Sequence, residues 1–214
     1  LPGHVSEVET MGQITIRELE KLDFFEGIPQ DILQNLLNES TVASYKKKEV
    51  IFHSRTRTEF VYFVLSGEVM LYNLTKHGNR KVIFILGKGR LLNQSIVSKK
   101  PNALFGEAVC PVQALKIPEG VFLRLMEQCH ELTYSILREY ERNLWRMGHQ
   151  LKNTTGNMQT ERKIAAKLWK LGRDFGVETE EGVMVDIDLT ITLMADLVGV
   201  PRENVSRACK VLTD

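Results

Sequence analysis

The stretch Thr192–Leu212, TLMADLVGVPRENVSRACKVL, predicts two short helices joined by a tight turn. The first helix is amphipathic and stops at Gly199, the residue type that most often ends a helix in the left-handed conformation. Pro201 falls in the first turn of the second helix, where its missing N–H costs nothing. Ala195 is small where the two helices would cross, and Val205 faces back toward the first helix. This register is typical of a helix-turn-helix.

The outward face of the second helix has polar side chains at positions i, i+1, i+4 and i+5, which lie on one side of a helix. Arginine can donate two hydrogen bonds to O6 and N7 of guanine, and a carboxylate can accept one from N4 of cytosine. We therefore predict that this helix reads the base edges of double-stranded DNA. The alternative, a surface hairpin of two helices with ordinary exposed charges, is disfavoured by the register around it. The predicted DNA-binding residues are Arg202, Glu203, Ser206 and Arg207, together with Thr192 and Asn204.

The charge of this region gives no general attraction to DNA. Residues 160–214 contain eight Lys or Arg and ten Asp or Glu, so this part of the chain is slightly acidic. The net charge of the whole chain, +1, says nothing about partners. Affinity for DNA must then come from individually placed side chains, helix N-termini and the avidity of a dimer.

The composition is that of an ordinary soluble globular protein, with 43% hydrophobic and 26% charged residues. A chain of 214 residues has room for one large domain or two small ones. No apolar run approaches the roughly 20 residues needed to span a bilayer, and the first residues do not form a secretory signal. We therefore expect no membrane partner.

The three cysteines, Cys110, Cys129 and Cys209, are far apart and form no CxxC pair. This pattern favours a reducing cytoplasm, and it argues against a disulfide framework, a zinc site or an iron–sulfur cluster. The histidines also lack the spacing of metal ligands. We expect a cytoplasmic protein without a metal or another cofactor.

An alternation of period two begins at Thr41 and predicts short strands separated by turn residues. Short strands at this spacing imply an antiparallel sandwich or barrel. Gly106 and Pro111 are expected to break the last segment. The predicted strands are Thr41–Tyr45, Glu49–His53, Phe60–Leu65, Glu68–Leu74, Arg80–Leu86 and Ala103–Ile117.

Helical periodicity is found on both sides of these strands. Pro29–Asn38 predicts a short helix before them, and Glu119–Gln128 predicts another after them. A run of helix-weakening residues, NTTGN at 153–157, indicates a hinge. Thr160 is expected to cap a helix over Glu161–Phe175. The remaining predicted features are anchors at Leu19, Leu22, Phe24 and Phe25, a strand over Val183–Ile187 after a turn at Gly182, and a helix-turn-helix that starts at Asp188 or Thr190.

A much longer helix is predicted over Glu131–Asn157, and its apolar residues recur in heptads. They form a narrow seam with charged flanks that include Arg138 and Glu139, as in a coiled coil. We predict that two copies of the chain pair along this seam. A helix packed on its own domain is the alternative, but it needs a wider apolar stripe. The predicted dimer interface is Thr133, Leu137, Tyr140, Leu144, Met147 and Leu151.

This order of parts resembles the catabolite-activator/fumarate-nitrate-regulator (CRP/FNR) family of bacterial transcription factors. The resemblance covers Phe24–Asp214, and its most specific pieces are YFVLSGEVMLY (Tyr62–Tyr72) and LVGVPRENVSRACKVL (Leu197–Leu212). It implies an α+β fold with an N-terminal antiparallel β-roll like that of cyclic-nucleotide-binding domains, a long dimerisation helix and a C-terminal winged helix-turn-helix. The expected parts are an effector-binding β-roll over residues 1–125, a dimerisation helix and hinge over 126–158, and a DNA-binding domain over 159–214.

The resemblance also implies a function. The chain would be an effector-responsive regulator that binds, as a homodimer, a near-palindromic operator with TGA-like half-sites and that contacts RNA polymerase. The family's fold continues with a small β-hairpin beyond the point that corresponds to Asp214, so the C-terminal wing is expected to be truncated or unseen here.

The effector residues depart from the family's pattern. In cyclic-AMP-binding members a Gly-Glu pair holds the ribose and an Arg-Ser pair holds the cyclic phosphate. Asn93 and Gln94 stand near the place of the first pair, and Asn102 and Ala103 near that of the second. Because a buried phosphate needs a fixed cation and several N–H donors, these changes argue against cyclic AMP. The pair Lys99–Lys100 offers charge instead, but adjacent loop lysines are more often solvated.

Haem and iron–sulfur sensing are disfavoured as well. No cysteine precedes Cys110, and haem-binding members place Cys and His in the loop that Asn93–Ser95 occupies here. We expect a small, largely apolar or aromatic effector with one or two polar groups. Gly148 would leave room for it beside the long helix, although a close helix approach without ligand explains this glycine equally well. The expected pocket is Leu91, Leu92, Asn93, Gln94, Asn102, Ala103, Leu104, Tyr140, Leu144, Met147 and Gly148.

Two other classes of function remain as alternatives. An enzyme on a cupin-like roll would need a His/Glu metal set or paired carboxylates, and the spacing of the nearest candidates, His53 and Glu68, supports no such set. We therefore expect no catalytic residues. A ligand-binding module that regulates another activity would end soon after the roll, whereas this chain continues into the helix-turn-helix.

Overall fold

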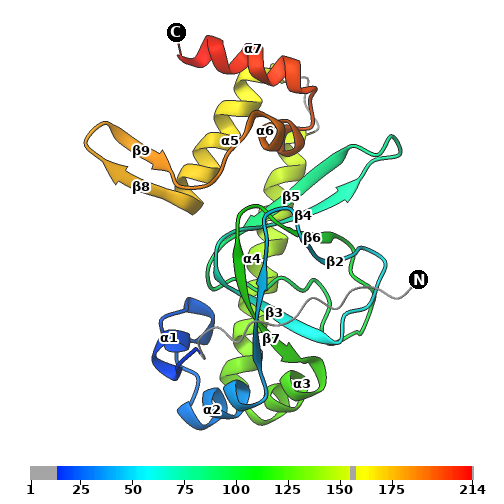
Figure 1. Cartoon of the computed structure of the whole chain (residues 1–214), viewed down its shortest axis with the longest axis vertical. Coiled ribbons are helices and arrows are strands. Elements are labelled where there is room, and N and C mark those ends of the chain that lie inside the picture. The colour runs from blue at the N-terminus through cyan, green and yellow to red at the C-terminus, as the bar shows by residue number, and fades with distance from the viewer. Residues whose placement is uncertain (1–13, 155–157, 214) are drawn as a thin grey trace. The chain divides into compact units, whose positions relative to one another are not determined.

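The computed structural model of the chain describes residues 14–154 and 158–213 (Figure 1). They form two compact units. The first unit contains the residues up to Val69 and Leu86–Asn143, and the second unit contains Met70–Ile85 and Leu144–Asp214. The predicted hinge at 153–157 falls largely on residues 155–157, which lie outside the described residues.

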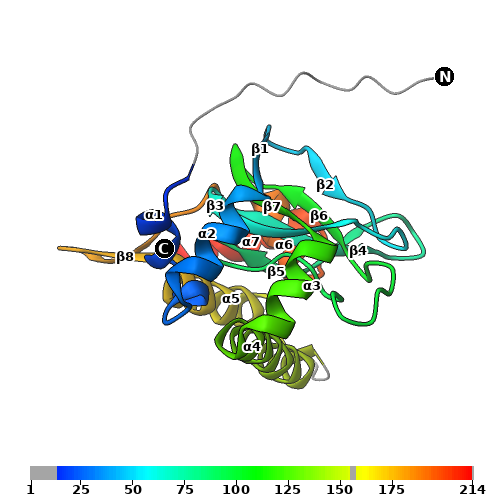
Figure 2. The ribbon, with the colours of Figure 1, turned by 90° about the horizontal axis from the view of Figure 1, so that it is seen from below.

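The helical segments of the first unit are α1 (Ile16–Glu20), η1 (Asp23–Phe25), α2 (Gln30–Asn38), α3 (Glu119–Gln128) and the first part of α4 (His130–Thr154). The predictions of α2 and α3 are confirmed. The two lie side by side, as Figures 1 and 2 show from two directions. Helix α1 begins at a capping box, because the Thr15 hydroxyl accepts from the Glu18 N–H and the Glu18 carboxylate accepts from the Thr15 N–H.

The strands of the roll are β1 (Thr41–Tyr45), β2 (Val50–Phe52), β3 (Phe60–Ser66), β4 (Val69–Leu74), β5 (Arg80–Leu86), β6 (Phe105–Ala108) and β7 (Val112–Pro118). One sheet has the order β1-β7-β3 and the other the order β2-β6-β4-β5. Strand β7 pairs antiparallel with both of its neighbours, with Thr41 opposite Lys116 on one side and Val61 opposite Ile117 on the other. The predicted antiparallel roll is confirmed.

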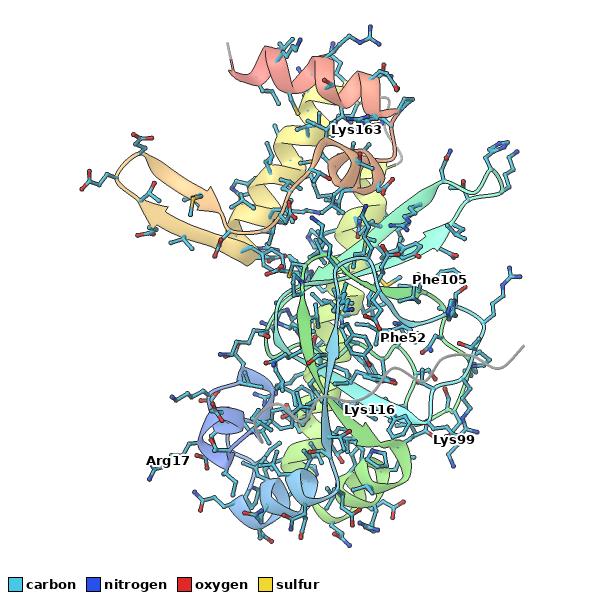
Figure 3. All side chains as sticks on the ribbon, in the orientation of Figure 1. Arg17, Phe52, Lys99, Phe105, Lys116 and Lys163 are labelled. Carbon is cyan, nitrogen blue, oxygen red and sulfur yellow. The ribbon has the colours of Figure 1, made fainter. Side chains whose placement is uncertain are left out.

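Gly106 does not break its strand, and that prediction is wrong. It lies inside β6, opposite Phe52 of β2, and the ring of Phe52 occupies the space above it (Figure 3 labels this ring). A Cβ on Gly106 would stand 2.7 Å from Cζ of Phe52. The glycine therefore makes room for an aromatic ring within the sheet.

The core of the first unit joins the N-terminal helices to the roll. The rings of Phe24 and Phe25 lie with their centroids 4.5 and 4.9 Å from that of Phe63 in β3. Burying such a side chain stabilises the fold by about 1.5–3 kcal/mol before chain entropy is subtracted. The predicted anchors Leu19, Leu22, Phe24 and Phe25 are all buried, which confirms them.

The second unit contains α5 (Thr160–Phe175), β8 (Gly176–Thr179), β9 (Gly182–Val185), α6 (Ile191–Val198), α7 (Arg202–Thr213), the C-terminal part of α4 and the hairpin of β4 and β5. Thr160 was expected to cap α5, but it is the first helical residue, and the N-cap is Gln159 without a side-chain hydrogen bond. The strand predicted over Val183–Ile187 is shorter. It pairs with β8, which the sequence did not predict.

None of the helices in the described parts of the chain is both long and apolar enough to cross a bilayer.

Candidate nucleic-acid interface and effector region

The first helix of the helix-turn-helix is fixed at both ends. The Thr190 hydroxyl accepts a hydrogen bond from the Leu193 N–H at 3.1 Å, so Thr190 rather than Asp188 is the N-cap of α6. Gly199 ends it with φ +70°, and its N–H donates to the carbonyl of Ala195 at 2.8 Å. A left-handed residue at this point turns the chain sharply toward α7.

Helix α7 is set by buried residues on its inner side. Pro201 precedes the helix rather than lying in its first turn, and its carbonyl accepts from the N–H groups of Asn204 and Val205. Val205 and Ala208 are buried, and α7 packs on both α5 and α6. The opposite face of α7 is thereby directed outward on a rigid support.

The predicted DNA-reading residues lie on that outward face. Arg202, Glu203 and Arg207 are exposed, while Ser206 and Asn204 are partly buried. Nη2 of Arg207 donates to Oδ1 of Asn204 at 2.6 Å, so the guanidinium is held by a neighbour one turn back. A sixth residue, Thr192, is exposed on α6. Their contact with DNA stays a prediction.

The predicted dimer seam on α4 is largely exposed in the single chain. The exposed fractions of Leu137, Leu144, Met147 and Leu151 are 57, 71, 45 and 65%. Two other predicted members face differently: the Thr133 hydroxyl donates to the Met126 carbonyl at 2.7 Å, and Tyr140 packs against the core of the first unit. The exposed part of the seam is therefore the row from Leu137 to Leu151.

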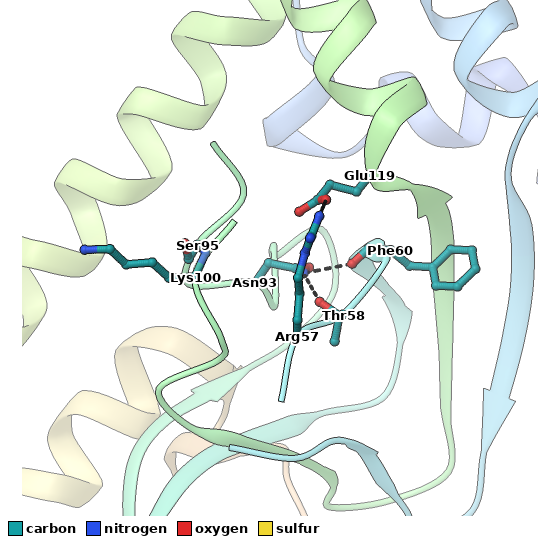
Figure 4. A network of polar contacts seen from close by, with 7 residues as sticks. All are labelled: Arg57, Thr58, Phe60, Asn93, Ser95, Lys100 and Glu119. Carbon is teal, nitrogen blue, oxygen red and sulfur yellow. Dashed lines mark hydrogen bonds and ion pairs between the residues drawn. The ribbon is translucent and has the colours of Figure 1, made fainter. Parts of the chain in front are cut away.

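In the predicted effector region, Asn93 is engaged by the roll itself. Its Oδ1 accepts from the Tyr62 N–H at 2.8 Å, and its Nδ2 donates to the Phe60 carbonyl at 2.9 Å and the Thr58 hydroxyl at 3.2 Å (Figure 4). Gln94 likewise donates to the Leu92 carbonyl and accepts from the Leu104 N–H. These side chains hold the loop rather than lie free for a ligand.

The other residues of the predicted pocket have unequal exposure. Leu91 and Leu92 are fully buried, Leu104 is half-buried, and Ala103 is exposed. A Cβ on Gly148 would meet nothing within 4 Å, so the helix does not approach another part of the described chain closely there. Lys99 lies at the periphery of the first unit (Figure 3), and the side chain of Lys100 points away from Asn93 (Figure 4).

Two residues outside the predicted pocket, Arg90 and Glu139, form an ion pair in the first unit. Glu139 was expected on the charged flank of the seam, but it is only 5% exposed, and its Oε2 lies 3.5 Å from Nη1 of Arg90. That expectation is wrong, because α4 turns this position toward the roll. Within the described residues, four buried side-chain polar atoms of the first unit have no hydrogen-bond partner: Asn102 Nδ2, Glu139 Oε1, Tyr140 Oη and Asn143 Oδ1. Burial also raises the pKa of the Tyr140 hydroxyl to about 12.

The described residues contain no group of three or more His, Cys, Asp or Glu side chains placed to hold a metal ion.

Residues 42–129 match the family model described as the cyclic nucleotide-binding domain. Over 191 residues the chain is 22% identical to a CRP-like cAMP-activated global transcriptional regulator of Mycobacterium tuberculosis, covering 89% of this chain and 85% of that protein. A global nitrogen regulator of Nostoc is 24% identical over 169 residues, covering 78% and 75%. Among solved structures, FixK2 from Bradyrhizobium japonicum superposes with a TM-score of 0.71 at 20% identity, covering 81% of this chain and 84% of its own.

In sequence and fold the chain is similar to transcription regulators of the CRP/FNR family. Its fold is the one expected for this family, with an N-terminal β-roll and a C-terminal helical domain. These relatives are transcription regulators rather than enzymes.

The resemblance implies that Asn93 and Asn102 lie near the positions where cyclic-AMP-binding members hold the nucleotide. In the structure the side-chain amide of Asn93 bonds the backbone of β3. Asn102 stands where a phosphate-binding arginine is expected, and it supplies no cation.

Proposed function

We propose that the chain is an effector-responsive transcription factor that binds a near-palindromic DNA operator as a homodimer. The observation that supports this most directly is the outward face of α7, where Arg202, Glu203 and Arg207 are exposed on a helix with a buried inner side. Arginine and carboxylate groups at this spacing match the donors and acceptors of the major groove. TGA-like half-sites and contact with RNA polymerase belong to the same proposal, as does a location in the cytoplasm.

The exposed row on α4 supports the dimeric part of the proposal. Leu137, Leu144 and Leu151 recur every seven residues and stay largely in solvent in one chain. A second copy of the same helix would cover this row. Two recognition helices related in this way would lie about one turn of DNA, roughly 34 Å, apart. An effector that favours this spacing would shift the population toward the DNA-binding state.

The effector is a molecule other than cyclic AMP. The amide of Asn93 already bonds three groups of the roll, and no arginine stands at Asn102 or Ala103 to neutralise a cyclic phosphate. We propose a small, largely apolar or aromatic molecule whose polar groups would meet the unpartnered atoms of Glu139, Tyr140 and Asn102. Thermal-shift measurements with cyclic AMP and a panel of phenols and aromatic acids test this. Stabilisation by cyclic nucleotides alone would refute it.

Selection from random duplex DNA with the purified protein tests the regulator proposal as a whole. The wild-type chain should enrich an inverted repeat whose half-sites are one turn apart. Arg207→Ala should lose the preference at one position of each half-site, while Lys210→Ala, which changes another exposed cation of α7, should keep it. Absence of any enriched sequence would contradict the proposal.

A further inference from the structure

A cavity of about 200 Å³ lies in the second unit, apart from the β-roll effector region. Its walls come from β5, the C-terminal part of α4 and α5. No step of the proposed regulation uses these residues. Their chemistry nevertheless differs from that of an ordinary surface hollow.

The walls are rich in cations. They contain Arg146, Lys167, Lys170 and Arg173, and Asp174 is the one carboxylate among the described lining residues. Asp174 is already engaged, since its Oδ2 lies 2.6 Å from Nη2 of Arg146 and its Oδ1 lies 3.3 Å from Nη2 of Arg173. Asp174 also attracts Lys167 and Lys170, but this one carboxylate does not balance the four cations of the wall.

Burial makes this excess of positive charge costly. The pKa of Lys167 is lowered to about 8, first by burial and then by the charges of Lys170 and Arg146. The pKa of Lys170 is lowered as well, by burial and by Arg173 and Arg146. An anion in the cavity would offset both effects, because it favours the charged form of each lysine.

Aromatic rings line the same cavity. Trp145 and Trp169 contribute to its wall although they are 56% and 68% exposed, and the guanidinium carbon of Arg146 lies 5.5 Å from the ring centroid of Phe84. Large exposed indoles next to cations form a surface on which a flat ring can stack. The volume limits what fits, since a cavity of about 150 Å³ accommodates benzene.

We propose that this cavity binds a small organic anion, consisting of one aromatic ring that carries a phosphate or a carboxylate. The anionic group lies between Lys167 and Lys170, and the ring lies against the indoles. Such a ligand contacts β5, α4 and α5 at once, so it ties these elements of the second unit together.

Phenyl phosphate is a suitable probe, and the chain provides its own signal. It contains two tryptophans, and both line the cavity. Titration of the full-length protein at constant ionic strength should change tryptophan fluorescence saturably, and calorimetry should give the same dissociation constant. Inorganic phosphate should bind at least tenfold more weakly, and phenol should give no saturable change. Equal binding of inorganic phosphate, or no saturable response to phenyl phosphate, overturns the proposal.

Three variants locate the binding. Lys167→Gln with Lys170→Gln should weaken phenyl phosphate binding at least tenfold, with an unchanged circular dichroism spectrum. Arg162→Gln removes an exposed charge from the same helix outside the cavity wall and should leave the affinity unchanged. Asn102→Ala in the β-roll should also leave it unchanged. Full loss in Asn102→Ala, or full retention in the double variant, places the ligand elsewhere and overturns the proposal.

Discussion

At the scale of single residues, Asn93 has a structural role in the roll. Its Oδ1 accepts from the N–H of Tyr62, and its Nδ2 donates to the Phe60 carbonyl and the Thr58 hydroxyl. The side chain therefore fixes the loop around Asn93 to the start of β3. Both N–H donors of the amide are therefore used within the roll, which leaves only one lone pair of Oδ1 to orient a ligand.

Asn93→Ala is expected to lower the free energy of unfolding by about 1–3 kcal/mol, because it leaves the buried N–H of Tyr62 without its acceptor. Urea unfolding followed by circular dichroism measures this. Asn35→Ala, at an exposed position of α2, is the matched control and should change stability little. Equal effects of the two substitutions would show that the bonds of Asn93 contribute nothing.

Arg207→Ala is expected to cost about 1–3 kcal/mol of binding to the selected operator and to relax the preference for one base pair. The guanidinium is exposed and held by Asn204, so its loss removes a contact without disturbing the inner side of α7. Fluorescence anisotropy on operator and unrelated duplexes checks this. An equal loss on both duplexes would contradict base reading.

The charge on Lys167 is expected to oppose folding at neutral pH. The folded chain releases this proton near pH 8, whereas an unfolded lysine holds it up to its usual pKa of 10.5. Stability therefore rises as the pH increases between these values, and below pH 8 the charged form carries its full cost. Lys167→Met should raise the thermal midpoint at pH 7, and the gain should shrink at pH 10. A gain of the same size at both pH values would refute this.

Some residue roles could be predicted from the sequence and others could not. Gly199 and the outward face of α7 follow from local helix rules, which need no knowledge of distant packing. No local rule predicts the burial of Glu139. Its carboxylate pairs with Arg90, which is far away in the sequence, so only the folded chain reveals this contact.

At the scale of elements, α4 has two different sides. Tyr140 and the buried Glu139 face the roll, while the row Leu137, Leu144 and Leu151 faces solvent. The heptad pattern predicts the apolar row on the solvent side. It cannot tell residues that pack on their own chain from residues that a second copy of the chain would cover. That is why Thr133 and Tyr140 were assigned to the seam although they contact the first unit.

Leu144→Asp is expected to yield monomers, because a charge in the middle of the exposed row cannot be buried against a second helix. Sedimentation velocity checks this. Leu74→Asp, which changes an exposed leucine of β4 outside the row, is the matched control and should keep the wild-type sedimentation coefficient. An unchanged coefficient in Leu144→Asp would exclude this seam.

The strands with alternating or buried patterns were predictable, and β8 was not. Its four residues are all exposed, so no burial period marks it, and its pairing with β9 is not visible in the sequence. The role of Gly106 was also not predictable from local sequence. A glycine in a strand usually indicates a break, whereas here it leaves room for the ring of Phe52 in the neighbouring strand β2.

At the scale of the whole molecule, the order of parts was predictable because each part has its own periodicity.

The proposed dimer makes the spacing of the DNA half-sites a geometric constraint. Inserting about half a turn of DNA, ~5 base pairs, between the half-sites should abolish tight binding of the wild-type chain. Gel shift with the two spacings measures this. Equal binding to both would mean that the two recognition helices act independently.

The hairpin of β8 and β9 has a consequence for handling the protein at high concentration. Both strands have an open edge, and Val177, Val183 and Met184 are exposed along them. Such edges favour strand exchange between molecules. Glu178, Glu180 and Glu181 interrupt the apolar residues and act as gatekeepers by mutual repulsion. Solubility of the purified chain thus depends on a few acidic groups at the tip of one hairpin, and their replacement by glutamine should lower the concentration at which it precipitates.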